Sequence, residues 1–185
     1  MGIVIGGMTI SLDGFVEDRD GSVGRLYPDM AALHETEELK EQIATTGAVV
    51  MGRRTFAMGD ADWYAGNYEF QVPIFVVTHH PPEKVPRQDD KLTFTFVTDG
   101  VASAVRQVKA AAGERNVVIV GGASTIQQCL RSGLVDILEL GIVPVVLGGG
   151  KALFDPAAAE GLQLEKIRVL DSPGRTDIRY RVVKG

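Results

Sequence analysis

The 185-residue sequence has few of the features that stabilise very small, secreted or membrane-bound proteins. Its one cysteine, Cys129, excludes an internal disulfide and fits a reducing compartment. No apolar run reaches about 18 residues, which excludes a membrane-spanning helix. The N-terminus lacks the basic start and cleavage site of a signal peptide. We therefore expect a cytoplasmic protein with no membrane association.

The sequence also has little positive charge and few metal-ligating side chains. Nineteen Lys and Arg against 24 Asp and Glu give a net charge of −5, which argues against nucleic acid as a partner. Of the three histidines, His79 and His80 are adjacent in an extended segment and point to opposite faces, so we expect no metal site. Apolar residues make up 45% of the chain and charged residues 23%, as in globular proteins. The length predicts one domain over residues 1–185.

Apolar runs alternate with helical patterns along most of the chain. The predicted strands are 3–11, 48–52, 72–79, 93–98, 117–121, 136–147, 164–170 and 175–183. The predicted helices are 29–44, 53–58, 101–112 and 124–132, with loops at 13–24 and 59–71. Strands separated by helices indicate an α/β fold with a mixed, mostly parallel central sheet and flanking helices. The two-sided apolar run 3–11 predicts a central strand.

The segment VVMGRRTF (49–56) combines a buried strand with a basic helix start. Gly52 is followed by Arg53, Arg54 and Thr55. Helix N-termini offer free N–H groups and a partial positive charge, and arginine adds fork-shaped donors. This pattern favours a phosphate pocket at the carboxyl end of a strand. The alternative is two surface arginines on a helix.

Two further strand ends carry glycine, hydroxyl or imidazole groups. In VVIVGGASTIQQCL (117–130), a glycine pair precedes Ser124 and Thr125, which either contact a phosphate or only cap the helix. In FVVTHHPP (75–82), Thr78 lies directly before two histidines. Cys129 falls on the apolar side of its helix and is interpreted as a core residue.

Charged residues near the two chain ends are open to more than one interpretation. Asp13, in ISLDGFV, follows the first strand, where a carboxylate orients a substrate or relays a proton, or simply forms an Asp-Gly turn. The basic residues of the last strand alternate with apolar ones and are interpreted as a solvated face: Arg175, Arg179, Arg181 and Lys184.

The segments SLDGFV, AVVMGRRTF, PIFVVTHHPP, VVIVGGAST and LVDILELGIVPVVLGGGKALF occur together and in this order. The set resembles the dihydrofolate-reductase-like superfamily, and most closely the C-terminal reductase domain of the riboflavin-biosynthesis deaminase–reductases and its stand-alone relatives. The resemblance runs from about residue 2 to residue 183. It implies the superfamily's three-layer fold, an NADPH cofactor and a homodimer.

The resemblance also implies roles for individual residues. Those implied to bind the cofactor are Gly52, Arg53, Arg54, Thr55, Thr78, His79, His80, Gly121, Gly122, Ala123, Ser124 and Thr125. The two arginines would meet the 2′-phosphate or pyrophosphate, and segment 78–80 the adenosine ribose and its 2′-phosphate. The glycine pair would be joined by a cis peptide bond, and the three residues after it would donate to phosphates.

The substrate side matches the family less closely. Asp13 is the carboxylate that falls on a family motif, and it is the residue expected to act in catalysis and to bind substrate. Phe15 and Trp63 are expected to form a wall against a flat substrate ring. Val120 replaces the glutamate that usually precedes the glycine pair in the riboflavin reductases. The acidic residues of the first helix, Glu35, Glu37 and Glu38, are interpreted as exposed charges.

The resemblance implies an NADPH-dependent oxidoreductase. It would transfer hydride to a C=N or C=O of a small heterocyclic or ribosylamino-pyrimidine-like substrate, as the riboflavin-biosynthesis reductases do. Two alternatives remain at this point: a dihydrofolate reductase, and an NADPH-binding module without turnover.

Overall fold

The computed structural model describes residues 2–28, 30–172 and 174–184. The strands are β1 (Val4–Ser11), β2 (Phe15–Glu17), β3 (Thr46–Gly52), β4 (Ile74–Val77), β5 (Phe94–Val97), β6 (Asn116–Ile119), β7 (Ile137–Val143), β8 (Lys151–Ala152), β9 (Gln163–Ser172) and β10 (Arg175–Val183). The helices are the 3-10 turn η1 (Gly24–Leu26), α1 (Met30–His34), α2 (Glu37–Thr45), α3 (Arg53–Phe56), α4 (Tyr64–Asn67), α5 (Val101–Ala112), α6 (Ala123–Arg131) and α7 (Pro156–Ala159).

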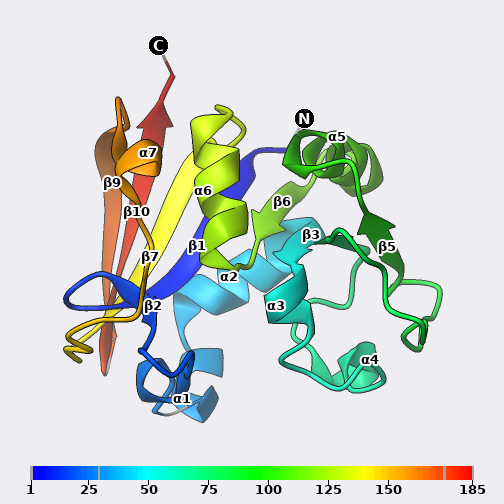
Figure 1. Ribbon diagram of the computed structural model, residues 1–185, viewed down its shortest axis with the longest axis horizontal. Helices are drawn as coiled ribbons and strands as arrows, with labels where there is room; N and C mark the ends of the chain where they lie inside the picture. The colour runs from blue at the N-terminus through cyan, green and yellow to red at the C-terminus, as the bar shows by residue number, and fades with distance from the viewer. Residues whose placement is uncertain (1, 29, 173, 185) are drawn as a thin grey trace.

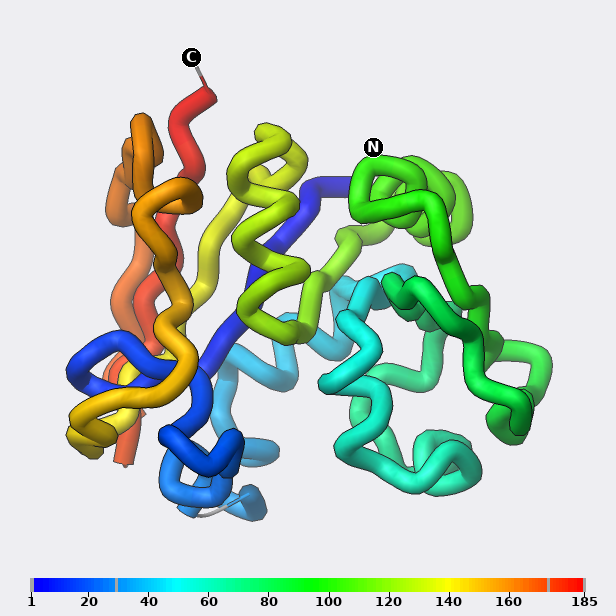
Figure 2. Tube along the Cα trace, viewed as in Figure 1, coloured from blue at the N-terminus to red at the C-terminus, as the bar shows by residue number. Residues whose placement is uncertain are grey.

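Eight of the described strands form one sheet, in the order β5-β4-β3-β6-β1-β7-β10-β9 (Figure 1). The first six in this order are parallel, while β10 is antiparallel to β7 and β9 is antiparallel to β10. β1 lies inside the sheet as predicted, and Figure 2 traces it in blue through the middle of the molecule. The predicted α/β fold with a mixed, mostly parallel sheet is confirmed.

The sheet buries apolar side chains on both faces, because neighbouring residues of a strand point to opposite sides. On one face, Val50 and Leu138 pack with the buried residues of α5 and α6 in the largest core cluster. On the other face, Val49 and Met51 form a second cluster, against which Leu39 of α2 packs. On this second face, the part of the sheet formed by β7 and β10 carries charged side chains in place of apolar ones.

The first predicted helix is interrupted, which corrects its expected span of 29–44. It consists of α1, which ends at His34, and α2, whose N-cap is Thr36. The Thr36 hydroxyl donates to the Leu33 carbonyl oxygen at 2.8 Å and accepts from the Leu39 N–H at 3.4 Å. A threonine that caps a helix in this way competes with continued helix at the same place. The cap predicted at Asp29 lies outside the described residues.

Three other segments differ from the predictions. The strand expected over 136–147 ends at Val143, directly before Pro144, which has no N–H to donate to a sheet. The expected loop 13–24 contains β2, which pairs antiparallel with β8. The expected loop 59–71 contains the single-turn helix α4. The other predicted helices and the closing antiparallel pair of strands are confirmed within a few residues.

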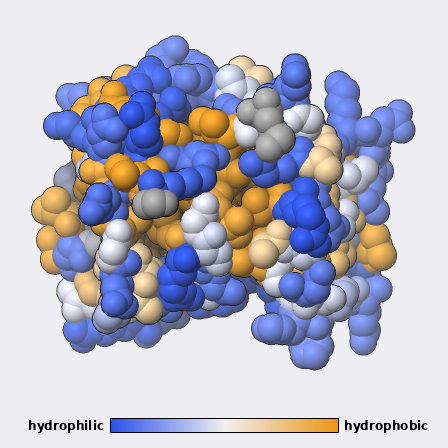
Figure 3. Space-filling view, turned by 90° about the horizontal axis from the view of Figure 1, so that it is seen from above, coloured by the Kyte–Doolittle hydropathy of each residue, from blue (hydrophilic) through white to orange (hydrophobic). Residues whose placement is uncertain are grey.

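Figure 3 views the molecule from the end that carries both termini. Hydrophilic residues form most of the rim there, and apolar residues gather toward the middle. No helix in the described ranges combines the length and the apolar character needed to cross a bilayer.

Candidate active site

Two of the glycine-containing turns predicted to bind a cofactor are in direct contact. The Gly52 N–H, at the end of β3, donates to the Gly121 carbonyl oxygen at 2.8 Å. A Cβ atom at Gly121 would lie 3.1 Å from the Thr55 Oγ1 atom, and a Cβ atom at Gly52 would lie 2.6 Å from the Thr125 Oγ1 atom. The Gly121–Gly122 peptide bond is cis, as the resemblance implies. The strand ends of β3 and β6 therefore approach each other at a distance that only glycine permits.

Helices begin directly after both turns. α6 starts at Ala123, with Ser124 exposed and Thr125 buried, while α3 starts at Arg53. Arg53 and Arg54 are both exposed, and Arg54 donates to the two carboxylate oxygens of Glu17 at 3.1 and 2.9 Å. The carboxylate of Glu17 thus holds one of the two guanidinium groups beside the turn that follows β2, where a Cβ atom at Gly21 would lie 3.6 Å from Arg54 Nη2.

The third predicted strand end follows β4, the neighbour of β3 in the sheet. The Thr78 hydroxyl donates to the His80 carbonyl oxygen at 2.9 Å and accepts from the His80 N–H at 3.2 Å. Thr78 is buried, whereas His79 and His80 are exposed. The hydroxyl therefore shapes a turn that leaves both imidazoles at the surface.

These three turns fit a phosphorylated dinucleotide. A cradle made of Gly52, Gly121 and Gly122 admits close backbone approach, and the N-terminus of α6 presents N–H groups and a partial positive charge. Exposed guanidinium groups and the Ser124 hydroxyl are available beside it. The binding role of each of these residues stays a prediction.

A cavity of about 660 Å³ lies on the α2 face of the sheet. Thr55 and Val120 line it on the side of the glycine turns, and Thr9, Gly141 and Asp177 line it on the far side. Residues within 23–27, 30–42 and 58–70 contribute further walls. The cavity therefore begins beside the predicted cofactor site and extends across β1 and β7 to β10.

Of the three residues predicted to contact substrate, Trp63 lies in the wall of this cavity. Trp63 packs against Tyr64 and Tyr68, with ring centroids 5.7 and 6.4 Å apart, so this wall is largely aromatic. The described residues that line the cavity include neither Asp13 nor Phe15. Roles for these two residues in substrate binding or catalysis stay predictions.

Asp13 forms hydrogen bonds to the loop that follows β7. Its carboxylate accepts the backbone N–H groups of Leu147 and Gly148 at 3.1 and 2.7 Å. Hydrogen bonding from Ser11, and then from these two N–H groups, lowers the pKa of Asp13 to about 2, so the group is ionised at neutral pH. An ionised carboxylate is a hydrogen-bond acceptor and a poor proton donor.

The depressed pKa of Asp13 predicts a pH-dependent contribution to stability. The folded pKa of about 2 lies below the unfolded value, which is about 3.9. Ionised Asp13 therefore stabilises the folded protein above the unfolded pKa, and this contribution is lost as the pH falls toward 2. In thermal unfolding, we expect Asp13→Asn to lower Tm most at pH 7 and progressively less toward pH 3. An equal difference in Tm at every pH would contradict this.

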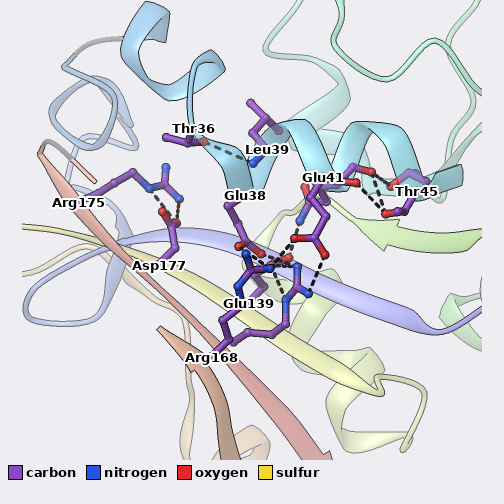
Figure 4. Close-up of polar contacts among 12 residues, drawn as sticks. Thr36, Glu38, Leu39, Glu41, Thr45, Glu139, Arg168, Arg175 and Asp177 are labelled. Carbon is purple, nitrogen blue, oxygen red and sulfur yellow. Dashed lines mark hydrogen bonds and ion pairs between the residues drawn. The ribbon is translucent and has the colours of Figure 1, made fainter. Parts of the chain in front are cut away.

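A buried ion-pair network joins α2 to the sheet (Figure 4). Arg179 of β10 donates to Glu139 of β7 at 2.8 and 2.9 Å and forms an ion pair with Glu38 of α2. Glu139 also accepts from the Gln42 side-chain amide at 2.6 Å. Two predictions are therefore wrong in part. Glu38 is buried, whereas Glu35 and Glu37 are exposed as expected, and Arg179 is largely covered, whereas Arg181 and Lys184 are exposed as expected. Arg175 likewise pairs with the buried Asp177.

Sequence reasoning also missed the titratable residue Glu69 in the cavity wall. Burial raises the pKa of its carboxyl group above the usual value. Burial likewise raises the pKa of its neighbour Tyr68 well above the usual value. No local signal in the sequence marks Glu69, because its loop reaches the cavity through long-range packing. Cys129 is buried as predicted, and burial raises its pKa to about 12.

The sheet order, the cis glycine pair and the cavity beside it define an α/β domain of the dihydrofolate-reductase type. The RibD C-terminal domain family matches residues 3–174, and the chain belongs to this family. The family is one of NADPH-dependent reductases. The resemblance inferred from the ordered motifs is thereby confirmed.

The chain is also similar to individual proteins. The chain is 30% identical over 159 residues to the uncharacterized protein YyaP of Bacillus subtilis (strain 168), which covers 80% of this chain and 77% of that protein. A putative riboflavin biosynthesis protein from Shewanella sp. PV-4 has a similar structure, with a TM-score of 0.76 and 23% identity over 98% of this chain and 99% of that one. A dihydrofolate reductase from Enterococcus faecalis, complexed with NADP(H), aligns with a TM-score of 0.61 and 16% identity over 99% and 98% of the two chains. These structural likenesses show the shared fold.

Proposed function

We propose that the protein is an NADPH-dependent reductase that transfers hydride to a C=N or C=O carbon of a small nitrogen heterocycle, such as a ribosylamino-pyrimidine. The observation that carries the proposal is the continuity between the two halves of the site. The glycine turns at Gly52 and Gly121 fit a dinucleotide, and the cavity of about 660 Å³ begins beside them at Thr55 and Val120. A second molecule therefore has room directly next to the cofactor site.

The chain's own residues supply binding, orientation and a proton. Arg53, Ser124 and the N-terminus of α6 would hold the phosphates of the dinucleotide, whose bound nicotinamide supplies hydride. The aromatic wall at Trp63 would support a flat ring. Glu69, a carboxyl group in the wall of the same cavity, would give the proton to the reduced substrate. The homodimer expected from the resemblance stays a prediction.

Turnover of NADPH tests this proposal directly. We expect the purified protein to oxidise NADPH, followed by loss of absorbance, with at least one substrate from a panel of ribosylamino-pyrimidines and dihydropteridines. Glu69→Gln should lower kcat and leave the Kd for NADPH unchanged. Dihydrofolate as the one active substrate would assign a dihydrofolate reductase. Tight NADPH binding with no oxidation on any substrate would contradict an enzyme and leave a binding module.

The paired arginines predict cofactor selectivity. The 2′-phosphate distinguishes NADPH from NADH, and charge-assisted hydrogen bonds from guanidinium groups to phosphate are about twice as strong as neutral ones. For the variant Arg53→Ala/Arg54→Ala, we expect calorimetry to give a Kd for NADPH raised about tenfold. The Kd for NADH should change much less. Equal effects on the two dinucleotides would mean that neither arginine contacts the 2′-phosphate.

A further inference from the structure

The far floor of the cavity holds a buried ion pair that is tightly placed. Asp177 and Arg175 lie two residues apart on β10, on the face that lines the cavity, and Asp177 is 4% exposed. The Arg175 Nε atom donates to Asp177 Oδ1 at 2.9 Å, and its Nη2 atom donates to the same oxygen. Figure 4 shows the two side chains pointing toward each other. The guanidinium group therefore binds one of the two carboxylate oxygens and leaves the other for a different partner.

The glycine opposite this pair is required for its position. Gly141 of β7 is the register partner of Asp177, and a Cβ atom there would lie 1.8 Å from Arg175 Nη2. The guanidinium group thus lies directly over the backbone of β7, where any other residue would displace it. On the next strand, β1, the Thr9 hydroxyl accepts from Arg175 Nη1 at 3.4 Å.

The second carboxylate oxygen, Asp177 Oδ2, is buried and has no hydrogen-bond partner among the described residues. A buried acceptor without a partner costs free energy, so native proteins rarely leave one. Glu139, on the same face, shows the usual arrangement, because Arg179 and Gln42 occupy its two oxygens. Asp177 departs from this arrangement, and it lines the cavity. This combination indicates that a bound molecule supplies the missing hydrogen-bond donor.

The chemistry of the pair defines that molecule. Asp177 and Arg175 together carry no net charge, so the floor suits a neutral ligand rather than a phosphate or an ammonium group. Oδ2 accepts an N–H, while Arg175 Nη1, whose 3.4 Å contact with Thr9 is long, donates to a carbonyl oxygen. We propose that Asp177, Arg175 and Thr9 recognise a lactam edge, an N–H next to a C=O on a flat nitrogen heterocycle. This inference rests on the proposed function and narrows its substrate class.

Two probes that differ only at the lactam edge test the subsite. Calorimetry would compare 5,6-diaminouracil, which has ring N–H groups beside its carbonyls, with its 1,3-dimethyl derivative, in which methyl groups replace these N–H groups. We expect the unmodified probe to bind the wild-type protein at least about tenfold more tightly, because a hydrogen bond to a charged acceptor is lost in the derivative. The cavity of about 660 Å³ has room for two added methyl groups, so their size does not explain such a loss.

The variant Asp177→Asn checks the assignment to this residue. It should weaken binding of 5,6-diaminouracil about tenfold and remove the preference between the two probes, with the Kd for NADPH unchanged. The wild-type comparison needs no variant, so it decides the question even if Asp177→Asn does not fold. Equal affinity for the two probes, or no binding of either by protein that binds NADPH, overturns the subsite and leaves the proposed reductase standing. A preference for the unmodified probe without any NADPH binding supports the subsite and contradicts the reductase.

Discussion

Replacing Arg179 by methionine is expected to lower the free energy of unfolding by about 3–5 kcal/mol, the usual cost of removing one partner of a buried ion pair. Arg179, Glu38 and Glu139 expose 18%, 9% and 5% of their side chains. Methionine fills a similar volume but leaves two neighbouring carboxylates without their shared cation. Because Glu38 belongs to α2, the variant should also loosen the wall of the cavity. Urea denaturation at pH 7 measures the change.

The neighbouring Arg181 provides a matched control. It lies on the same strand and pairs with Glu165 at 2.8 Å, but the two side chains are 58% and 57% exposed. Solvent screens such a pair, so Arg181→Met should cost about 1 kcal/mol or less. Adding Glu139→Gln to Arg179→Met should recover part of the lost stability, because one uncompensated charge is removed. Equal effects of Arg179→Met and Arg181→Met would show that the network contributes no more than a surface pair.

Most of the sheet could be predicted from the sequence because each parallel strand carries its own signal. Runs such as 48–52 and 117–121 are apolar on both faces and end at glycine, so neither partner strands nor distant loops are needed to recognise them. The cis peptide between Gly121 and Gly122 was accessible through the family resemblance. The pairing of β2 with β8 was not, since it joins segments more than 130 residues apart that are too short to show a pattern.

The charged floor of the cavity could not be predicted, for a related reason. Alternating arginines on a terminal strand are typical of a solvated face, and a glutamate in the first turn of a helix is typical of an exposed one. Glu38 and Arg179 are 141 residues apart, and they compensate each other only once α2 is packed on the sheet. The orphaned oxygen of Asp177 has no counterpart in the sequence at all, because a missing partner is a property of the folded site.

Replacing Gly52 by alanine is expected to raise the Kd for NADPH by more than about tenfold, which corresponds to more than about 1.4 kcal/mol. The backbone at Gly52, with φ −78° and ψ 158°, is open to any residue, so the effect is purely steric. The added Cβ would lie 2.6 Å from Thr125 Oγ1 and 3.2 Å from the Gly122 nitrogen. Thr125 is buried and β-branched, so it has little freedom to move away. The end of β3 must then separate from α6, which opens the predicted phosphate cradle.

Gly6→Ala is the matched control, because Gly6 lies in β1 and its added Cβ would meet neighbours no closer than 3.5 Å. It should leave the Kd for NADPH within about twofold, since such contacts are ordinary packing distances. If the collision with Thr125 is the cause, the double variant Gly52→Ala/Thr125→Ala should bind NADPH more tightly than Gly52→Ala, although Thr125→Ala alone weakens binding. Fluorescence titration of the four variants measures this. Wild-type affinity in Gly52→Ala would show that the dinucleotide does not bind at the junction of β3 and α6, and the proposed reductase would lose its cofactor site.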